Sequence, residues 1–497
     1  MHPTSTVRRI SIAALAAGAL ALALISSPAQ ARSARAAEDP MVIAPAPGTT
    51  APVAGPGLIG HQGRWLTDAN GRVMLVNGVN FVSKDNRTPE QRGFGADDAQ
   101  FLADQGFDVV RLGLSPDAFM PLPGKVNTVY LRSFARTVKT LTDHGLLVLI
   151  DVHQDGWGPG TSGNGFPRWM TRTHGATNTR TPFPLYYITN PAIQAAFQSF
   201  WDNEKGPDGI GLQDQVATMW SALAGAVGSN PNVIGYDILN EPWPGTTWEP
   251  CVYGGPKGCP AQDAAGLDEL HAKVAKAIRA KDQSHLIFGE PYVLFNFGQA
   301  GTSIRKPGDD ARSGMAFHMY TAAPADEPNV LRNAVRWSNR TGGALLASEF
   351  GAVKTPTDIH RMVGEMDDAL MPWIWWTYDE NFIHDMAKPP TGDNVDHTVV
   401  DALVRPHAVA VAGTPSGHRY DPASRVLELS WKTLAPGNRR VVASAPTVIK
   451  IPKQVYGTGY TVKVTGGTVT SAADAPVLTV ANAAGASSVT VTVTPAP

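Results

Sequence analysis

Two glutamates in this chain lie in apolar segments that read as buried strands. Glu241 follows Asn240 in "YDILNEP" (236–242), and Glu349 lies in "ALLASEFG" (344–351). The carboxyl ends of the strands of a closed parallel barrel gather on one side, so the two side chains can meet there. Such a pair supports nucleophilic attack and proton transfer when one carboxyl is ionised and the other is protonated. We therefore predict that the two side chains share one cleft.

The pair suits hydrolysis of a glycosidic bond by double displacement. That reaction needs two carboxyl groups about 5 Å apart, one as the nucleophile and one as the acid/base. Glu349 is the expected nucleophile, kept ionised by Arg111 and by a hydrogen bond from Tyr320. Glu241 is the expected proton donor, with His318 close to it and fewer cations around it. For either glutamate alone, a solvated carboxylate at a strand end is the competing interpretation.

Other polar and aromatic residues also fall at predicted strand ends. Asn240 is placed to bind the sugar 2-hydroxyl, and Trp376 is placed to form an apolar platform under the sugar ring. Trp375 precedes Trp376 in a strand, so one of them is expected in the core and the other in the site. His153, two residues before Asp155, fits a site residue, a core histidine or half of a metal pair. Because no second histidine or carboxylate cluster accompanies it, no zinc or iron site is predicted.

Eight nearly continuous apolar segments are the predicted strands that position these residues. Strands with so little polar alternation are typical of a parallel sheet covered on both faces. Helical spacing recurs between most of them, and eight strand–helix units predict a closed (β/α)8 TIM barrel, an α/β fold. A doubly wound open sheet is the alternative, but no glycine-rich phosphate loop opens the series. The strands are predicted at 71–80, 107–114, 146–153, 233–241, 285–290, 315–320, 344–351 and 372–378, with the reactive side chains, including Arg111 and His318, at their carboxyl ends.

The barrel is predicted to span residues 58–413, with a small antiparallel β-sandwich at 414–497. Segments such as "RVLELSWK" and "SSVTVTVTP" alternate polar and apolar residues, as strands with one buried face do. Residues 32–57, rich in Ala, Pro and Gly, are expected to form a disordered spacer. Residues 1–31 combine a basic head, a short apolar run and an Ala-x-Ala site, which is typical of a cleaved export signal. Secretion is therefore predicted, and an uncleaved N-terminal anchor is the alternative.

The cysteines and the net charge limit the possibilities further. The chain has only two cysteines, Cys251 and Cys259, in "EPCVYGGPKGCP". In an exported protein this spacing predicts a disulfide that braces a local loop, with two free thiols as the alternative. The net charge of −2 gives no electrostatic reason to expect a nucleic acid partner.

Several motifs resemble glycoside hydrolase family 5. They are "LNEP" after the fourth predicted strand, "FHMY" at the sixth, "SEFG" at the seventh and the tryptophans of the eighth. Within that family, "DVHQDGW" (151–157), "SGNGFPRWM" (162–170), "YDILNEPWPG" and "WIWWTYDEN" (373–381) resemble the endoglycoceramidases, and the resemblance runs from about residue 58 to the end of the chain. Those enzymes cut between the glycan and the ceramide of a glycosphingolipid. The resemblance implies this reaction and this substrate here, and the double displacement implies no cofactor.

The resemblance also implies roles for individual residues. Glu241 corresponds to the acid/base and Glu349 to the nucleophile. No metal ligand is implied. The residues that match the family's site positions are Arg111, His153, Asn240, His318, Tyr320 and Trp376, and those that match its contacts with the sugars are Lys84 and Asp155.

The lipid half of the implied substrate has weaker counterparts in the sequence. The aromatic residues of the insertion 154–187 and of "PYVLFNFG" (291–298) either form an apolar trough for the ceramide chains or pack as loop cores. We expect a monomer that binds a glycosphingolipid and contacts a membrane or micelle surface transiently. Two other functions stay open: another family 5 β-glycosidase that acts on soluble glycans, and a glycolipid-binding protein without catalysis. No Gly-x-Ser-x-Gly motif supports a serine hydrolase.

Overall fold

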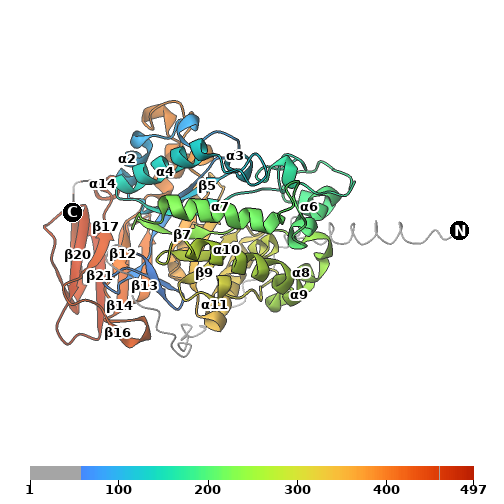
Figure 1. Ribbon diagram of the computed structural model, residues 1–497. Coiled ribbons are helices and arrows are strands. Elements are labelled where there is room, and N and C mark those ends of the chain that lie inside the picture. The colour runs from blue at the N-terminus through green and yellow to red at the C-terminus, as the bar shows by residue number, and fades with distance from the viewer. Residues whose placement is uncertain (1–57, 458) are drawn as a thin grey trace, which may run out of the picture.

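The central element of the structure is a closed parallel barrel (Figure 1). The computed structural model describes residues 58–457 and 459–497. The barrel strands follow the order β10-β11-β4-β5-β6-β7-β8-β9, and the predicted (β/α)8 barrel is confirmed. These strands are β4 (Asn77–Val82), β5 (Val109–Leu114), β6 (Leu147–Val152), β7 (Val233–Asp237), β8 (Leu286–Gly289), β9 (Ser313–Met319), β10 (Ala344–Phe350) and β11 (Trp373–Trp375).

The inside of the barrel changes from apolar to charged along the strands. Val109 of β5 and Leu149 of β6 belong to an apolar cluster contributed by most of the barrel strands. Two residues further along the same strands come Arg111 and Asp151, whose side chains share that face because side chains alternate along a strand. Both charged residues are completely buried. The charged layer therefore lies nearer the carboxyl ends of the strands, where barrel enzymes place their reactive groups.

Helices surround the barrel with their apolar faces packed on it. For example, α4 (Thr128–Asp143) buries Tyr130, Phe134, Val138 and Leu141, which are spaced three or four residues apart. Asn127 caps this helix by accepting a hydrogen bond from the Tyr130 N–H. The other helices of at least seven residues are α2 (Ala96–Asp104), α6 (Pro191–Trp201), α7 (Leu212–Val227), α10 (Glu269–Arg279), α11 (Glu327–Thr341), α12 (Pro356–Asp368) and α13 (His397–Leu403).

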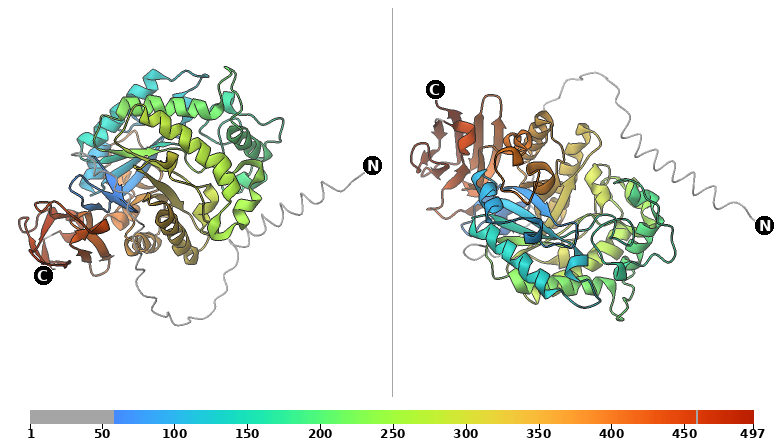
Figure 2. Two further views of the ribbon diagram at one scale, coloured as in Figure 1. Left: turned by 60° about the horizontal axis from the view of Figure 1, so that its bottom comes forward. Right: turned by 90° about the horizontal axis from the view of Figure 1, so that it is seen from above.

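The C-terminal strands form antiparallel sheets on the side of the barrel away from α6, as Figures 1 and 2 show in red. One sheet has the order β13-β14-β21-β18, and the other has the order β1-β2-β3-β12-β17-β20-β19. The strands are β1 (Gly60–Gln62), β2 (Trp65–Thr67), β3 (Val73–Met74), β12 (His407–Val411), β13 (Thr414–Asp421), β14 (Val426–Lys432), β17 (Thr447–Lys450), β18 (Tyr460–Thr465), β19 (Gly467–Val469), β20 (Val477–Asn482) and β21 (Ser488–Pro495).

The division between barrel and sandwich differs from the prediction. β1 to β3 and β12 come from residues 58–413, which were assigned to the barrel, yet they belong to a sandwich sheet. The single strand predicted at 71–80 is two strands, because β3 pairs antiparallel with β12 before the chain enters the barrel as β4. Both pieces are buried at every residue, so the pattern of residues alone does not reveal the break.

Two groups of charged residues, each around a buried carboxylate, join the barrel to the sandwich. Asp108, just before β5, contacts His407 Nε2 of β12 at 2.7 Å and Lys450 Nζ of β17 at 2.7 Å. Burial alone would raise the pKa of Asp108, but Lys450 and His407 lower it to about 2. These contacts cross the boundary between the domains. The second group consists of Asp367 of α12 with Arg405 and His418.

The predictions about cellular placement fall mostly outside the described residues. The predicted export signal, residues 1–31, and the predicted spacer, residues 32–57, both lie there. In the described ranges no helix is long and apolar enough to cross a bilayer. Cys251 and Cys259 form a disulfide in the segment that follows β7.

Candidate active site

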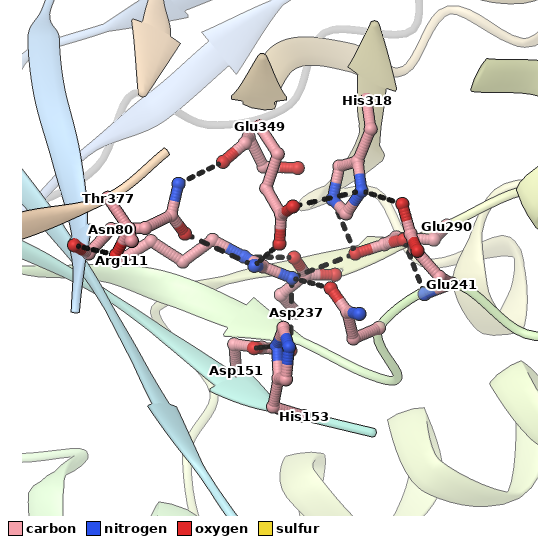
Figure 3. Close-up of polar contacts among 12 residues, drawn as sticks. Asn80, Arg111, Asp151, His153, Asp237, Glu241, Glu290, His318, Glu349 and Thr377 are labelled. Atoms are coloured by element: carbon pink, nitrogen blue, oxygen red, sulfur yellow. Dashed lines mark hydrogen bonds and ion pairs between the residues drawn. The ribbon is translucent and has the colours of Figure 1, made fainter. Parts of the chain in front are cut away.

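Glu241 and Glu349 lie together at the carboxyl ends of the barrel strands (Figure 3). Glu241 comes four residues after the end of β7, and Glu349 is the penultimate residue of β10. A carboxylate oxygen of one lies within 4.8 Å of a carboxylate oxygen of the other. Their side chains keep 4% and 5% of their surface exposed, so neither is sealed from solvent. This spacing is that of a nucleophile and an acid/base in double displacement, about 5 Å.

Glu349 is held by three groups that surround its carboxylate. Arg111 Nη1 donates to Oε1 at 2.6 Å, and the Tyr320 hydroxyl donates to Oε2 at 3.1 Å. His318 Nδ1 lies 3.5 Å from Oε2. The arginine and tyrosine contacts are those predicted for a nucleophile, and they fix the direction in which the carboxylate points.

Glu241 has different surroundings, which favour the protonated acid. His318 Nδ1 and Asn296 Nδ2 both contact its Oε1, each at 2.8 Å. Among the described residues no hydrogen bond reaches Oε2, so this oxygen is free to carry the proton. Burial raises the pKa of Glu241, and the charges of Glu349 and Asp155 raise it further, whereas His318 opposes them. The predicted proton donor thus has the chemical environment that its role requires.

Glu241 also has an unusual backbone conformation, with φ of 42°. Few residues other than glycine adopt this left-handed region, so the surrounding structure must stabilise it. Its backbone N–H donates to Glu290 Oε2 at 2.9 Å. Gln154 Nε2 donates to the carbonyl oxygens of Asn240 and Glu241 at 2.7 and 2.9 Å. The segment that carries the acid is therefore fixed by two buried polar side chains.

Arg111 is the centre of a buried network inside the barrel. It lies within β5 rather than at its end, and His318 likewise lies within β9, so the predicted positions are corrected by a few residues. Four carboxylates within 3.1 Å compensate the guanidinium for its complete burial, and two amide oxygens complete the set. These partners are Asp151 at 3.1 Å, Asp237 at 2.9 Å, Glu290 at 2.9 Å, Glu349 at 2.6 Å, Asn240 at 3.0 Å and Asn80 at 3.2 Å.

Three of these carboxylates could in principle hold a cation. Oxygens of Asp151, Asp237 and Glu290 lie within 4.8 Å of one another. The guanidinium of Arg111 contacts all three, so it already occupies the place that a metal ion would take. Burial raises the pKa of Asp237 well above its ordinary value, and Glu290 adds to this effect. The set is therefore explained by a buried arginine without any metal.

His318 connects the two glutamates to Glu290. Its Nε2 lies 3.2 Å from Glu290 Oε1, on the opposite side of the ring from Glu241. Burial alone would lower the pKa of His318, but the charges of Glu290 and Glu349 raise it well above its ordinary value. These two carboxylates therefore favour the protonated form of the ring. A positive charge at this point offsets part of the repulsion between Glu241 and Glu349.

Several of these residues were missed in the sequence. Glu290 ends "HLIFGE", Asp151 lies in "LLVLIDVH" and Asp237 lies in "VIGYDIL". The available signal was an acidic residue inside a segment expected to be buried on both faces, since such a charge needs a partner. Asn296 gave no comparable signal, because it lies in a short 3-10 helix, Val293–Phe297, whose contact with Glu241 depends on the fold.

A second group of predicted residues lies beside the glutamates. The rings of His153 and Trp376 stack, with centroids 5.6 Å apart. Lys84 Nζ lies 2.9 Å from Asp155 Oδ2 and 4.5 Å from the centre of the Trp376 ring. Trp375 is fully buried whereas Trp376 is 8% exposed, so Trp375 is the core residue and Trp376 the site residue, as predicted. These four predicted site residues therefore lie side by side.

Two of the individual predictions need adjustment. His153 is a buried histidine whose Nδ1 contacts Asp151 at 2.8 Å, and its Nε2 lies 3.5 Å from Asp155. Burial lowers its pKa, but Asp151 and Asp155 overcome this effect and raise the pKa to about 9. A protonated imidazole is not a metal ligand. Asn240 accepts from Arg111 and donates one N–H to the Gln154 carbonyl oxygen, so only its second N–H is left for a sugar hydroxyl.

The aromatic residues proposed for a lipid trough pack mostly as loop cores. Trp157 and Phe166 are fully buried and stack at 4.4 Å, and Tyr187 stacks on Trp243 at 5.3 Å. Tyr292 and Phe295 are buried too, at 4% and 1% exposure. Of this set, the aromatic side chain with a large exposed fraction is Phe183, at 49%. The alternative that these rings stabilise the long loops is therefore the correct one for most of them.

Comparison with known proteins assigns the family. Residues 68–382 match the model described as cellulase (glycosyl hydrolase family 5), and residues 405–494 match the C-terminal domain of glycoside hydrolase family 5. The chain belongs to glycosyl hydrolase family 5. This glycoside hydrolase therefore has the barrel and the C-terminal domain of its family, and the second match begins near β12, in agreement with the sheet topology.

Relatives that match most of the chain carry one name. Endoglycoceramidase I of Rhodococcus hoagii (strain 103S) is 31% identical over 442 residues, which cover 84% of this chain and 85% of that protein. Endoglycoceramidase of Cyanea nozakii is 28% identical over 448 residues, which cover 80% of this chain and 85% of that protein. Among solved structures, endo-glycoceramidase II from Rhodococcus sp. superposes with a TM-score of 0.73 at 27% identity, covering 87% of this chain and all of that one. That enzyme has also been solved with ganglioside GM3 and as a lactosyl-enzyme intermediate.

Proposed function

We propose that this family 5 enzyme is a retaining endo-glycosidase that cuts the bond between the glycan and the ceramide of a glycosphingolipid. The observation that carries the proposal is the approach of Glu241 and Glu349 to within 4.8 Å in surroundings of opposite character. The match with endoglycoceramidases over more than four-fifths of the chain supports the choice of substrate class.

The geometry assigns each glutamate a step. Glu349, directed by Arg111 and Tyr320, attacks the anomeric carbon of the sugar that is joined to ceramide. The bond from that carbon to the ceramide oxygen breaks, and Glu241 gives its proton to the departing oxygen, which leaves as the ceramide hydroxyl. Glu241, now a carboxylate, takes a proton from water, and the resulting hydroxide equivalent attacks the same carbon. This attack releases the glycan and restores both glutamates to their starting charge.

The groups around the glutamates favour this sequence of charges. The imidazolium of His318, 2.8 Å from Glu241, stabilises the carboxylate that forms when the proton leaves. Lys84, His153, Asp155 and Trp376 form the surface on which the sugar binds, because they combine charged donors with an aromatic face. Besides the substrate and one water molecule, these steps use side chains of this chain.

We also propose that residues 1–31 direct the export of the enzyme. A disulfide between the only two cysteines supports an oxidising environment. The enzyme then acts as a monomer on glycolipids presented by a membrane or micelle.

A product analysis tests the proposed function. Incubation with a mixed glycolipid panel is expected to release intact glycans and intact ceramide, identified by mass. Cleavage only between sugars, or only of soluble glycans, would instead favour another family 5 β-glycosidase.

A matched pair of variants separates catalysis from binding. Glu349→Gln removes the nucleophile and is expected to lower kcat by a factor on the order of 10⁴ to 10⁶, with glycolipid binding largely kept. Glu428→Gln, at an exposed position in β14, is the control and should act as wild type does. If Glu349→Gln and wild type behave alike, the protein is a glycolipid-binding protein.

A further inference from the structure

A hollow lies near the active site, lined by the segment that joins β6 to α6 and by the first turn of α6. Its volume is about 380 Å³, within the range of small-molecule sites, about 300–1,000 Å³. Residues 161–163 form one part of its lining and residues 179–181 another, and Tyr186, Asn190 and Ile193 complete it. Only Ile193 contributes an apolar aliphatic side chain. Hydroxyl, amide and guanidinium groups beside the Tyr186 ring can bind the hydroxyl groups and the apolar face of a sugar.

The hollow adjoins residues that form the active site. Asp155 and Asn164 exchange two backbone hydrogen bonds, each 2.9 Å long, and Asn164 Nδ2 donates to the Asp155 carboxylate at 2.9 Å. Gly163, which lines the hollow, therefore backs directly onto Asp155. The contact is so close that a Cβ at Gly163 would come within 2.0 Å of the Asp155 carbonyl oxygen.

Tyr186 links the hollow to the catalytic residues from the other side. Its ring lies against Gly156, where an added Cβ would come within 3.0 Å of it. Burial raises the pKa of Tyr186, and the charges of Asp155 and Glu241 raise it further, because its hydroxyl lies within electrostatic reach of both. Tyr186 therefore lines the hollow and also contacts Gly156, the residue that follows Asp155.

The charge of the hollow points to one kind of sugar. Arg180 is exposed, and among the described residues it has no hydrogen-bond or ion-pair partner. No acidic residue is among the described residues that line the hollow, so the guanidinium supplies its only formal charge. A free guanidinium binds carboxylate or sulfate groups with two parallel hydrogen bonds.

From this geometry we infer that the hollow is a distal glycan subsite that takes an acidic sugar residue, with Arg180 as the residue that selects it. The inference rests on the proposed function, since it needs a glycan that extends away from the bond that is cut. Sugars near the bond lie on the surface of Asp155, Lys84 and Trp376, and the acidic residue comes further along the glycan.

Three matched substrates test the inference. They are a ceramide with two neutral sugars, the same glycolipid extended by one neutral sugar, and the same glycolipid extended by one carboxylated sugar. Arg180→Ala is expected to lower kcat/KM about 10-fold for the carboxylated substrate and to leave the two neutral substrates unchanged. The difference should shrink at high salt, because an exposed ion pair is screened.

Two further variants make the result decisive. Arg132→Ala removes an exposed arginine from the outer part of α4 and should change none of the three values. Thr179→Trp fills the hollow from an exposed position and should lower kcat/KM for both three-sugar substrates but not for the two-sugar one. An Arg180→Ala variant that cleaves the carboxylated substrate as well as wild type does, or that loses all three substrates equally, overturns the inference. Failure of wild type to release ceramide from any of them would instead overturn the proposed function.

Discussion

The barrel mouth and the boundary between barrel and sandwich both contain buried charges, but the balance of charge differs. In each boundary group one carboxylate lies between two basic groups; Asp108 lies between Lys450 and His407, and its pKa is lowered to about 2. At the mouth carboxyl groups crowd around few cations, and the pKa of Glu241 is raised. The comparison teaches that burial alone does not decide the charge of a carboxyl group. The ratio of acids to bases around it decides between a fixed ion and a proton donor.

The difference also separates two purposes. An ionised carboxylate with two basic partners changes little over the physiological pH range, so the Asp108 group stabilises the join between domains. A carboxyl group that keeps its proton when buried is available to donate it, which is what the reaction asks of Glu241. The cost is a set of like charges held close together, and such costs are typical of active sites.

Among the changes that distinguish these two regions, removal of the acid at the mouth should have the largest effect. Glu241→Gln cannot protonate the departing ceramide oxygen, so kcat/KM is expected to fall about 10²- to 10⁴-fold. With a substrate whose leaving group is an acidic phenol, no proton is needed for the first step. The covalent glycosyl-enzyme should then accumulate, because Glu241 is also the base of the second step. Mass analysis of the quenched protein detects this intermediate, and an equal loss with both substrates would contradict the assigned role.

Removal of the carboxylate at the boundary should affect stability and spare catalysis. Asp108→Asn leaves Lys450 and His407 without their acid, and the expected loss is about 3 kcal/mol of unfolding free energy, because Lys450 is a quarter exposed and partly rehydrated. Chemical denaturation measures the loss, and kcat/KM at 25 °C should stay unchanged. Asp143→Asn is the control, since its surface pair with Lys139 contributes little. A loss of activity without a loss of stability would show that the two regions are not separable in this way.

Glu290 lies at the barrel mouth but contacts no reacting atom, so its replacement tests how the mouth positions the acid. Glu290→Gln keeps the shape, yet its amide cannot accept from Arg111, His318 and the Glu241 N–H together. We expect kcat to fall about 10²-fold, with KM little changed, because the backbone of the acid shifts. The matched control is Glu327→Gln, which removes another buried glutamate, paired with Arg361 in the outer layer of helices. If Glu290→Gln changed KM alone, Glu290 would act on substrate binding instead.

The two regions should respond to pH with opposite signs, which is the smallest of the expected effects. The folded-state pKa of Asp108, about 2, lies below its unfolded value of about 3.9. Asp108 therefore contributes about 2 kcal/mol to the free energy of unfolding above pH 4, and this contribution is lost as the pH falls through 2. For Glu241 the folded-state pKa is raised, so stability is lost as pH rises above the unfolded value. The unfolding free energy of Asp108→Asn should therefore decrease less at acid pH than that of wild type does. Glu241→Gln should be more stable than wild type at neutral pH, and parallel curves for all three proteins would refute the assignment.

The sequence was sufficient for the parts of the structure that depend on local pattern. The eight barrel strands were predicted from apolar runs, and the residues at their ends included both glutamates. Residues inside the strands were harder to place, because a strand's period of two says which residues share a face but not which face is the interior. Arg111 was recognised by motif, whereas its partners Asp151 and Asp237 were not.

What the sequence determined by itself is therefore the succession of strands and helices, the family and the pair of glutamates, since hydrophobic period and short motifs carry that information. Only the tertiary structure decided the rest. It joined β3 to β12 across more than 300 residues, packed Trp157 and Phe166 as a loop core, and brought Asn296 and Glu290 to the acid. The physical reason is that the pKa of Glu241 depends on burial and on charges contributed by other strands. The distances between Glu241 and these charges are fixed only when the barrel closes and brings the strands together.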